Sequence, residues 1–327
     1  MLPGKFPPLV RVPNFCRLSS KARAKGSRKD IMATIELTTE KISGLRHVNR
    51  HGLKPGRYEF PDFLLIGPQR TGTSWLHENL CFHPEVFMPS KKELYFFNKL
   101  ITKSGTNYTS DRLEWYSARF TPRFSDIIRQ NAVHLKNTRS LGSLNFNFKK
   151  LFSPCIKGEA TASYAVMKES LIEEIALLNA DIKAIMLIRN PLERAWSHAK
   201  KDLLRQTKKT LKEVSIDDFK KFYSKDYQLR CGGYSEIIRK WSLIIGRDKF
   251  FIGIYDDIET RPNDLLRSIF SFLGVSNSPE HINSLLSSVV INKTTKDVIP
   301  ERHRAFLLDL FGNELEELNQ TFKMRWS

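Results

Sequence analysis

The feature that most constrains the fold is a glycine-framed loop within residues 63–75, FLLIGPQRTGTSW. The apolar run before it ends in Gly67, as a buried strand does, and apolar residues after it recur at helical spacing. Gly67 and Gly72 have the G-x-x-x-x-G spacing of loops that bind phosphate through backbone amides and the N-terminus of the next helix. The sequence therefore predicts an anion site between a strand and a helix.

The loop lacks the lysine that nucleoside triphosphatases use at the β- and γ-phosphates. Thr73 stands at that position, the hydroxyl residue Ser74 follows it, and the cation Arg70 lies inside the loop. No strand with a convincing acidic Mg²⁺ ligand at its end accompanies it. A divergent P-loop kinase or nucleotide hydrolase stays an alternative, disfavoured by the missing lysine, and a single 5′-phosphate group still fits such a loop.

Two further strand–turn–helix units follow. KAIMLI at 183–188 predicts a strand, and Pro191 suits the first turn of the helix after it. KFFIGIY at 249–255 predicts another strand, with a helix between Pro262 and Gly274. Strands separated by helices imply a parallel sheet covered on both faces. We therefore expect an α/β protein with a P-loop-like three-layer fold, in which helices flank a central parallel sheet.

Charge and composition divide the chain in two. The formal charge is +18, and residues 1–30 hold eight cations against one acid. We expect residues 1–58 to form a basic, disordered extension and residues 59–327 to form one domain, for which 41% hydrophobic residues suffice. A basic chain attracts anionic partners, nucleic acid among them. No recognised nucleic-acid-binding module occurs, so a nucleic-acid partner is the disfavoured alternative.

The sequence lacks the apolar segments that are typical of membrane anchors and secretory signals. The chain has no run of 18 apolar residues and no apolar segment of a secretory signal, so we expect neither a transmembrane anchor nor secretion. A disordered tail or an upstream start before Met32 is favoured over organelle targeting by the basic N-terminus. The four cysteines form no C-x-x-C pair, so we expect no metal site and no disulfide framework. These features predict a cytoplasmic location.

The loop resembles the 5′-phosphosulfate loop of sulfotransferases that use 3′-phosphoadenosine-5′-phosphosulfate (PAPS). The resemblance implies that its residues bind the phosphosulfate, and that Arg70, where most members have Lys, also stabilises the leaving phosphate during catalysis. Trp75 matches a residue that stacks on adenine in the cytosolic branch, and a core position is the alternative. The matching loop residues are Arg70, Thr71, Gly72, Thr73 and Ser74.

A second segment, LIRNPLERAWSHA at 187–199, resembles the 3′-phosphate motif of the same family, R-D/N-P-x-x-R-x-x-S. Arg189 and Ser197 fall on its two phosphate ligands. Arg189 follows a strand at the carboxyl edge of the predicted sheet, where ligands bind in open α/β folds. Ser197 lies eight residues later, about two helical turns along the next helix. We interpret Arg194, also in the motif, as structural.

A third segment, HPEVFMPSKKELYFFNKL at 83–100, resembles one in heparan sulfate and related carbohydrate sulfotransferases. Their catalytic glutamate matches Glu93, which implies a general base for the acceptor. A solvated acid beside Lys91 and Lys92 is the alternative. Two later matches imply weaker cofactor contacts, at Tyr234 in GGYSEIIRKW and at Lys293 and Thr294 in INKTTKDVIPERHR.

The resemblance covers roughly residues 60–275, with a weaker match to about 325. It implies transfer of a sulfuryl group from PAPS to a hydroxyl or amine, without a metal, leaving adenosine 3′,5′-bisphosphate. The base segment points to a carbohydrate acceptor. Ala160, where some glycan enzymes have a lysine, and the lack of an anchor point away from Golgi glycan enzymes. A carbohydrate, a glycolipid or a secondary metabolite fits both, and the oligomeric state is not predicted.

Overall fold

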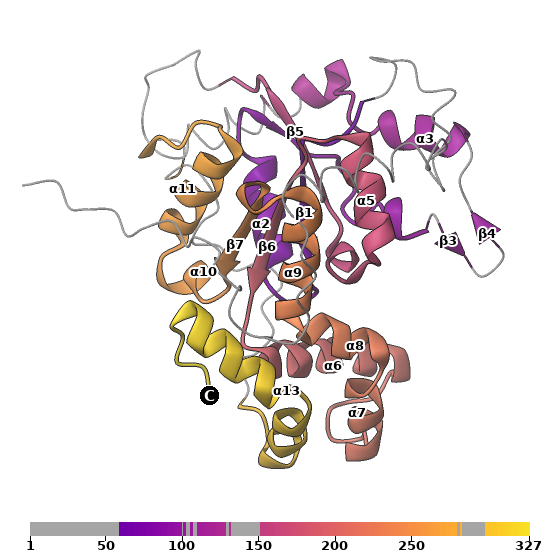
Figure 1. The fold of residues 1–327 in the computed structure, drawn as a ribbon, viewed down its shortest axis with the longest axis vertical. Helices are drawn as coiled ribbons and strands as arrows, with labels where there is room; N and C mark the ends of the chain where they lie inside the picture. The colour runs from indigo at the N-terminus through magenta and orange to yellow at the C-terminus, as the bar shows by residue number, and fades with distance from the viewer. Residues whose placement is uncertain are drawn as a thin grey trace, which may run out of the picture.

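The computed structural model describes residues 59–99, 101–102, 105–106, 110–128, 131, 151–279, 282 and 298–327 (Figure 1). Its centre is a five-stranded sheet of order β2-β5-β1-β6-β7 in which every neighbouring pair is parallel. The strands are β1 (Phe63–Gly67), β2 (Val86–Phe87), β5 (Ile156–Ala160), β6 (Lys183–Ile188) and β7 (Phe250–Ile254). The predicted parallel sheet is confirmed.

Successive side chains of β1 enter two separate cores. Leu64 and Ile66 pack in a core shared with α5 (Glu169–Leu178) and α9 (Tyr234–Ile245). Phe63 and Leu65 pack in a core shared with α2 (Thr73–Cys81) and α11 (Pro262–Leu273). Strands buried on both faces need apolar residues throughout, which explains the run FLLI. Helices thus cover both faces, and the predicted three-layer fold is confirmed.

A third cluster of apolar side chains joins helices that lie together at one end of the sheet (Figure 1). Its members include Trp196, Phe219 and Phe311. The helices of this region are α6 (Pro191–Thr207), α7 (Ile216–Tyr223), α8 (Asp226–Gly232) and α13 (Glu301–Phe322). Because α6 starts directly after β6, this helical group stands beside the carboxyl ends of the strands.

The residues after α13 fold back onto the sheet. The indole nitrogen of Trp326 donates to Asp256 at 2.6 Å, just after β7. The side-chain amide of Asn190 donates to the main-chain oxygen of Ser327 at 3.2 Å, just after β6. The end of the described chain therefore lies against the turns that leave two neighbouring strands.

Shorter elements complete the described chain: η2 (Phe97–Lys99), the antiparallel pair β3 (Ile101–Thr102) and β4 (Gly105–Thr106), α3 (Ser110–Ser117), η4 (Ala162–Val166), η5 (Arg247–Lys249) and α10 (Asp257–Thr260). No helix in the described part of the chain is long and apolar enough to cross a membrane. Residues 1–58 and the candidates Lys293 and Thr294 lie outside the described residues.

The order of the strands places the site. β1 lies in the middle of the sheet, with β5 and β2 on one side and β6 and β7 on the other. The chain leaves β1 toward one edge and later continues on the opposite side. Ligands of open α/β sheets bind at the carboxyl ends of the strands where the order reverses in this way. The loop after β1 is therefore at the position where a ligand is expected.

Candidate active site

The loop between β1 and α2 has a backbone shape that requires its glycines. Gly67, Arg70 and Gly72 have φ values of 94°, 72° and 86°, in the left-handed region. A Cβ on Gly67 would lie 2.1 Å from the backbone oxygen of Ala162, and one on Gly72 would lie 2.3 Å from Cδ1 of Ile258. The chain turns tightly here and delivers the first amides of α2 to the end of the sheet, where they favour an anion.

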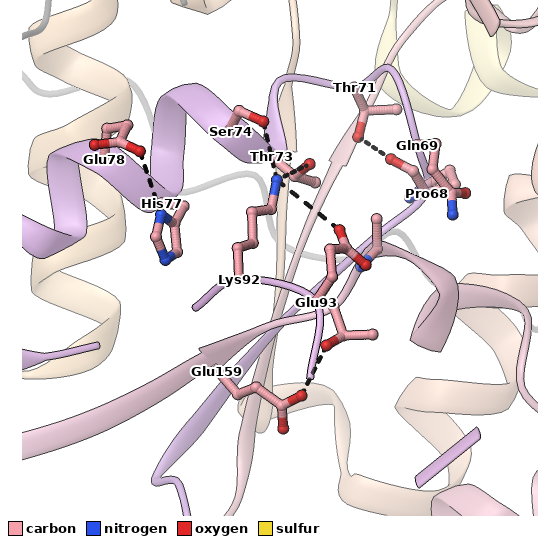
Figure 2. Close-up of polar contacts among 12 residues, drawn as sticks. Pro68, Gln69, Thr71, Thr73, Ser74, His77, Glu78, Lys92, Glu93 and Glu159 are labelled. Atoms are coloured by element: carbon pink, nitrogen blue, oxygen red, sulfur yellow. Dashed lines mark hydrogen bonds and ion pairs between the residues drawn. The ribbon is translucent and has the colours of Figure 1, made fainter. Parts of the chain in front are cut away.

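Side chains inside the loop fix this shape. The hydroxyl of Thr71 donates to the carbonyl of Pro68 at 2.8 Å (Figure 2), and Thr71 is fully buried. The amide of Gln69 donates to the hydroxyl of Tyr227 on α8. The side chain of Thr71, a predicted ligand, is therefore engaged in holding the loop, and its backbone is the part suited to contact a phosphate.

The first two predicted motifs meet in the structure. Nε of Arg70 donates to the hydroxyl of Ser197 at 2.9 Å, although the two residues are 127 positions apart. Burial, followed by the charge of Arg189, lowers the pKa of Arg70. The loop cation thus points toward the second turn of α6, and two guanidinium groups lie close enough to repel one another.

Arg189 follows β6 and is held from several sides. Its guanidinium pairs with Glu193 at 2.9 Å, lies 4.4 Å from the ring centre of Tyr255, and donates to the carbonyl of Arg70 at 3.4 Å. Its backbone amide donates to the hydroxyl of Tyr234, at 3.4 Å. Sequence reasoning missed Glu193 and Tyr255. The i, i+4 spacing from Arg189 would have indicated the first, and the position after β7 the second.

Two other predicted residues are buried away from the surface. Trp75 is 2% exposed and packs in the core behind α2, in agreement with the core alternative that the sequence left open. Tyr234 is fully buried, and its hydroxyl accepts a hydrogen bond from the backbone amide of Arg189. Arg194 is also fully buried and donates to the carbonyl of Gln228 at 3.3 Å, as a structural residue would.

Glu93 lies at the carboxyl end of β5. Its backbone amide donates to the carbonyl of Ala160 at 2.8 Å, and its carboxylate accepts from the amide of Ala162 at 3.1 and 3.2 Å. The side chain is 25% exposed. Burial raises the pKa of Glu93, and the charge of Lys92, the Ala162 amide and the hydroxyl of Tyr95 hold the increase in check. Such a partly buried, oriented carboxylate differs from a solvated surface acid.

Lys92 connects the base segment to the loop. Its ammonium donates to the hydroxyls of Thr73 and Ser74, each at 3.0 Å, and lies 4.0 Å from the carboxylate of Glu93 (Figure 2). Burial lowers the pKa of Lys92. Sequence reasoning gave Lys92 no definite role, because nothing in the sequence indicates that a lysine 18 positions after Ser74 returns to it.

A buried acid lies behind Glu93. Glu159 on β5 accepts hydrogen bonds from the hydroxyl of Tyr116 and, at 2.7 Å, from that of Thr161. Burial raises the pKa of Glu159 to about 7, while its hydroxyl partners oppose the shift. The network supports the end of β5 from which Glu93 and Ala162 are positioned. Among the described residues, no group of three or more His, Cys, Asp or Glu side chains could hold a metal ion.

Comparisons with known proteins match this chain to sulfotransferases. Residues 60–303 match the family model described as the sulfotransferase domain. The chain is 23% identical over 264 residues to the bifunctional heparan sulfate N-deacetylase/N-sulfotransferase 1 of Caenorhabditis briggsae, covering 75% of this chain and 26% of that protein. It is 27% identical over 229 residues to the human bifunctional heparan sulfate N-deacetylase/N-sulfotransferase 2, covering 66% and 22%.

A third relative is the membrane-associated sulfotransferase kil1 of Dictyostelium discoideum, 26% identical over 137 residues, covering 42% of this chain and 22% of that protein. The chain thus spans about a quarter of the length of these curated relatives. Among solved structures, a sulfotransferase from Alicyclobacillus acidocaldarius superposes with a TM-score of 0.52 at 20% identity, covering 82% of this chain and 97% of that one. This likeness shows the shared fold.

Proposed function

Because the chain belongs to the sulfotransferase family, we propose that it transfers a sulfuryl group from PAPS to an acceptor hydroxyl or amine, leaving adenosine 3′,5′-bisphosphate. One observation supports this most directly. Nε of Arg70 and Oγ of Ser197 lie 2.9 Å apart at the carboxyl edge of the sheet. The two residues come from two motifs that resemble the two phosphate sites of the family. The alternative of a kinase or nucleotide hydrolase is not favoured by the family match.

The charges of the site fit a ligand with two separate phosphates. Burial and the neighbouring guanidinium both disfavour the charged form of Arg70. A bound phosphate between the motifs would offset both effects, since charge-assisted hydrogen bonds from guanidinium to phosphate are strong. The ring of Tyr255 supports Arg189 from one side and leaves its N–H donors directed elsewhere.

Each donor-binding residue then has a distinct task. The amides of residues 71–74, with the hydroxyls of Thr73 and Ser74, bind the 5′-phosphate at the N-terminus of α2. Arg189 and Ser197 bind the 3′-phosphate, and Arg70 bridges the two motifs and stabilises the charge that grows on the leaving phosphate. PAPS, when bound, supplies the sulfuryl group. Trp75 supports α2 from the core.

Glu93 is the proposed general base. Its carboxylate is oriented by the Ala162 amide and lies on the same side of the sheet edge as the hydroxyls at the start of α2. It accepts the proton of the acceptor oxygen or nitrogen while that atom attacks sulfur opposite the leaving phosphate. A carboxylate whose pKa is raised by burial is a stronger base than a solvated one.

The acceptor is proposed to be a carbohydrate. The curated relatives named above include heparan sulfate N-sulfotransferases, so a glycan with free glucosaminyl amines is the first acceptor to test. A glycolipid head group and a secondary metabolite are the other candidates. We also propose a domain at 59–327, whose start agrees with the family match at residue 60, and a cytoplasmic location.

Calorimetric titration with adenosine 3′,5′-bisphosphate tests the proposal, with ATP plus Mg²⁺ as the control ligand. We expect the bisphosphate to bind and ATP not to. Arg189→Ala should weaken bisphosphate binding at least about tenfold, because a phosphate loses a charged hydrogen-bond partner worth about 1.5–3 kcal/mol. Arg239→Ala, which removes an exposed arginine on α9, is the matched control and should bind normally. Binding of ATP alone would contradict the proposal.

A further inference from the structure

The ammonium of Lys92 occupies an electrostatically unfavourable place. It lies against the hydroxyls of Thr73 and Ser74, at the N-terminus of α2, where the helix dipole repels a cation. Its side chain is only 21% exposed, so water solvates the charge poorly. Burial lowers the pKa of Lys92, Lys201 on α6 lowers it further, and Glu93 and Glu78 oppose this. An anionic group bound directly beside the ammonium would relieve both penalties.

The loop's own cation is oriented toward a different element. Arg70 directs Nε to Ser197 on α6, at 2.9 Å. Thr73 replaces the lysine that phosphate loops have before the hydroxyl residue, and its hydroxyl accepts from Lys92 at 3.0 Å. The cation that contacts the hydroxyls of Thr73 and Ser74 therefore comes from the segment after β2.

We propose that Lys92 is a catalytic residue of the sulfuryl transfer, and that its ammonium binds an oxygen of the transferring sulfuryl group. This role rests on the proposed function. The leaving phosphate is assigned to the hydroxyls of Thr73 and Ser74, and the attacking acceptor atom to the carboxylate of Glu93. Lys92 contacts both sets of groups, at 3.0 Å and 4.0 Å, so the sulfuryl group that passes between them lies beside its ammonium (Figure 2).

Lys92 is not itself altered in the proposed transfer. The acceptor O–H or N–H bond breaks, its proton goes to Glu93, and the acceptor atom forms a bond to sulfur. The bond between sulfur and the bridging oxygen breaks, and its electron pair stays on the leaving phosphate. Lys92 keeps its protons throughout and stabilises the negative charge on the sulfuryl oxygens by hydrogen bonding.

Variants of two adjacent lysines test the role. Lys92→Met removes the charge and keeps the length, Lys92→Arg keeps the charge, and Lys91→Met alters an exposed neighbour. The first readout is the release of bisphosphate from PAPS in water without any acceptor, and the second is transfer to a glycan with free glucosaminyl amines. Lys92→Met should lower both rates about 100-fold, as the loss of one charge-stabilising donor does. Lys92→Arg should recover part of the rate, and Lys91→Met should match the wild type.

One affinity measurement and one stability measurement distinguish a catalytic role of Lys92 from a structural role. Adenosine 3′,5′-bisphosphate lacks the sulfuryl group, so Lys92→Met should change its Kd by less than about threefold while the rate falls. The melting temperature of Lys92→Met should not fall, because the substitution removes a poorly solvated charge.

The pH profile of kcat/KM provides a further test, because a purely structural role of Lys92 would leave that profile unchanged. Lys92 holds the pKa of Glu93 down, so Lys92→Met should raise that pKa and shift the acidic limb of kcat/KM to higher pH. Lys92→Arg should leave the limb in place. The other titratable groups that act on Glu93 are present in every variant: Tyr95 in its own segment, Lys201 on α6, Glu159 on β5 and Tyr227 on α8.

Three outcomes would overturn the role. Wild-type rates and an unmoved acidic limb in Lys92→Met would remove Lys92 from catalysis. Parallel losses of bisphosphate affinity, rate and melting temperature would make it a structural residue. A wild-type protein that binds neither PAPS nor the bisphosphate would overturn the proposed function itself, and this result is obtained before any variant is made.

Discussion

Glu93 is the residue whose replacement best separates binding from chemistry. Glu93→Gln should bind adenosine 3′,5′-bisphosphate normally and lose turnover by about 100-fold or more, as the loss of a general base does. Single-turnover rates and calorimetry on the same preparation check both parts. An active Glu93→Gln protein would place the base elsewhere.

The stability of the same variant follows from the raised pKa of Glu93. A carboxyl whose pKa is higher in the folded than in the unfolded protein stabilises the fold in its protonated form. That contribution is lost as the pH rises from the unfolded pKa through the folded pKa. At pH 7 the amide of Glu93→Gln should therefore be tolerated, and thermal unfolding should show a melting temperature no lower than that of the wild type.

At the scale of single residues, the sequence allowed predictions only where a local pattern was available. Arg70 and Ser197 were predicted because each sits in a strand–turn–helix segment, and the structure brings the two side chains together. Glu159 accepts a hydrogen bond from the hydroxyl of Tyr116, 43 positions away, and Lys92 donates hydrogen bonds to α2. Such contacts depend on which elements become neighbours, and no spacing within the sequence records this.

Among the structural elements, the loop after β1 depends on its two glycines to different degrees. Both have positive φ, which costs another residue about 1–3 kcal/mol. At Gly67 an added Cβ also meets the backbone of Ala162, which cannot move independently, whereas at Gly72 it meets the end of the Ile258 side chain. Gly67→Ala should therefore lower the free energy of unfolding more than Gly72→Ala. Urea denaturation of both variants checks the order, and equal losses would contradict it.

Elements were predictable where their residues are uniformly apolar. The strands β1, β6 and β7 were predicted because FLLIG, KAIMLI and FFIGI are short apolar runs between turns. β5, with the sequence IKGEA, contains two charged residues and was not predicted. It becomes a strand because it lies between β1 and β2, where Gly158 admits the ring of Phe63 and tyrosines satisfy its glutamate. Tertiary neighbours here outweigh local propensity.

For the whole molecule, the charge of +18 should be visible in binding kinetics. An excess of cations raises the rate at which a multiply charged anion reaches its site, and salt screens this attraction. The association rate constant of adenosine 3′,5′-bisphosphate should fall about tenfold between low and physiological salt, with a smaller change in the dissociation rate constant. Stopped-flow measurements over a salt series check this. An association rate constant that ignores salt would show that net charge does not guide the ligand.

The last residues of the described chain have a practical consequence. Ser327 accepts a hydrogen bond from Asn190, the residue directly after Arg189, and Trp326 is bonded to Asp256 beside Tyr255. Any sequence joined after Ser327, an affinity tag included, would begin next to the turn that presents Arg189. A tag rich in histidine or acidic residues would alter the local charge there, so its identity becomes a variable in every measurement of ligand affinity on this protein.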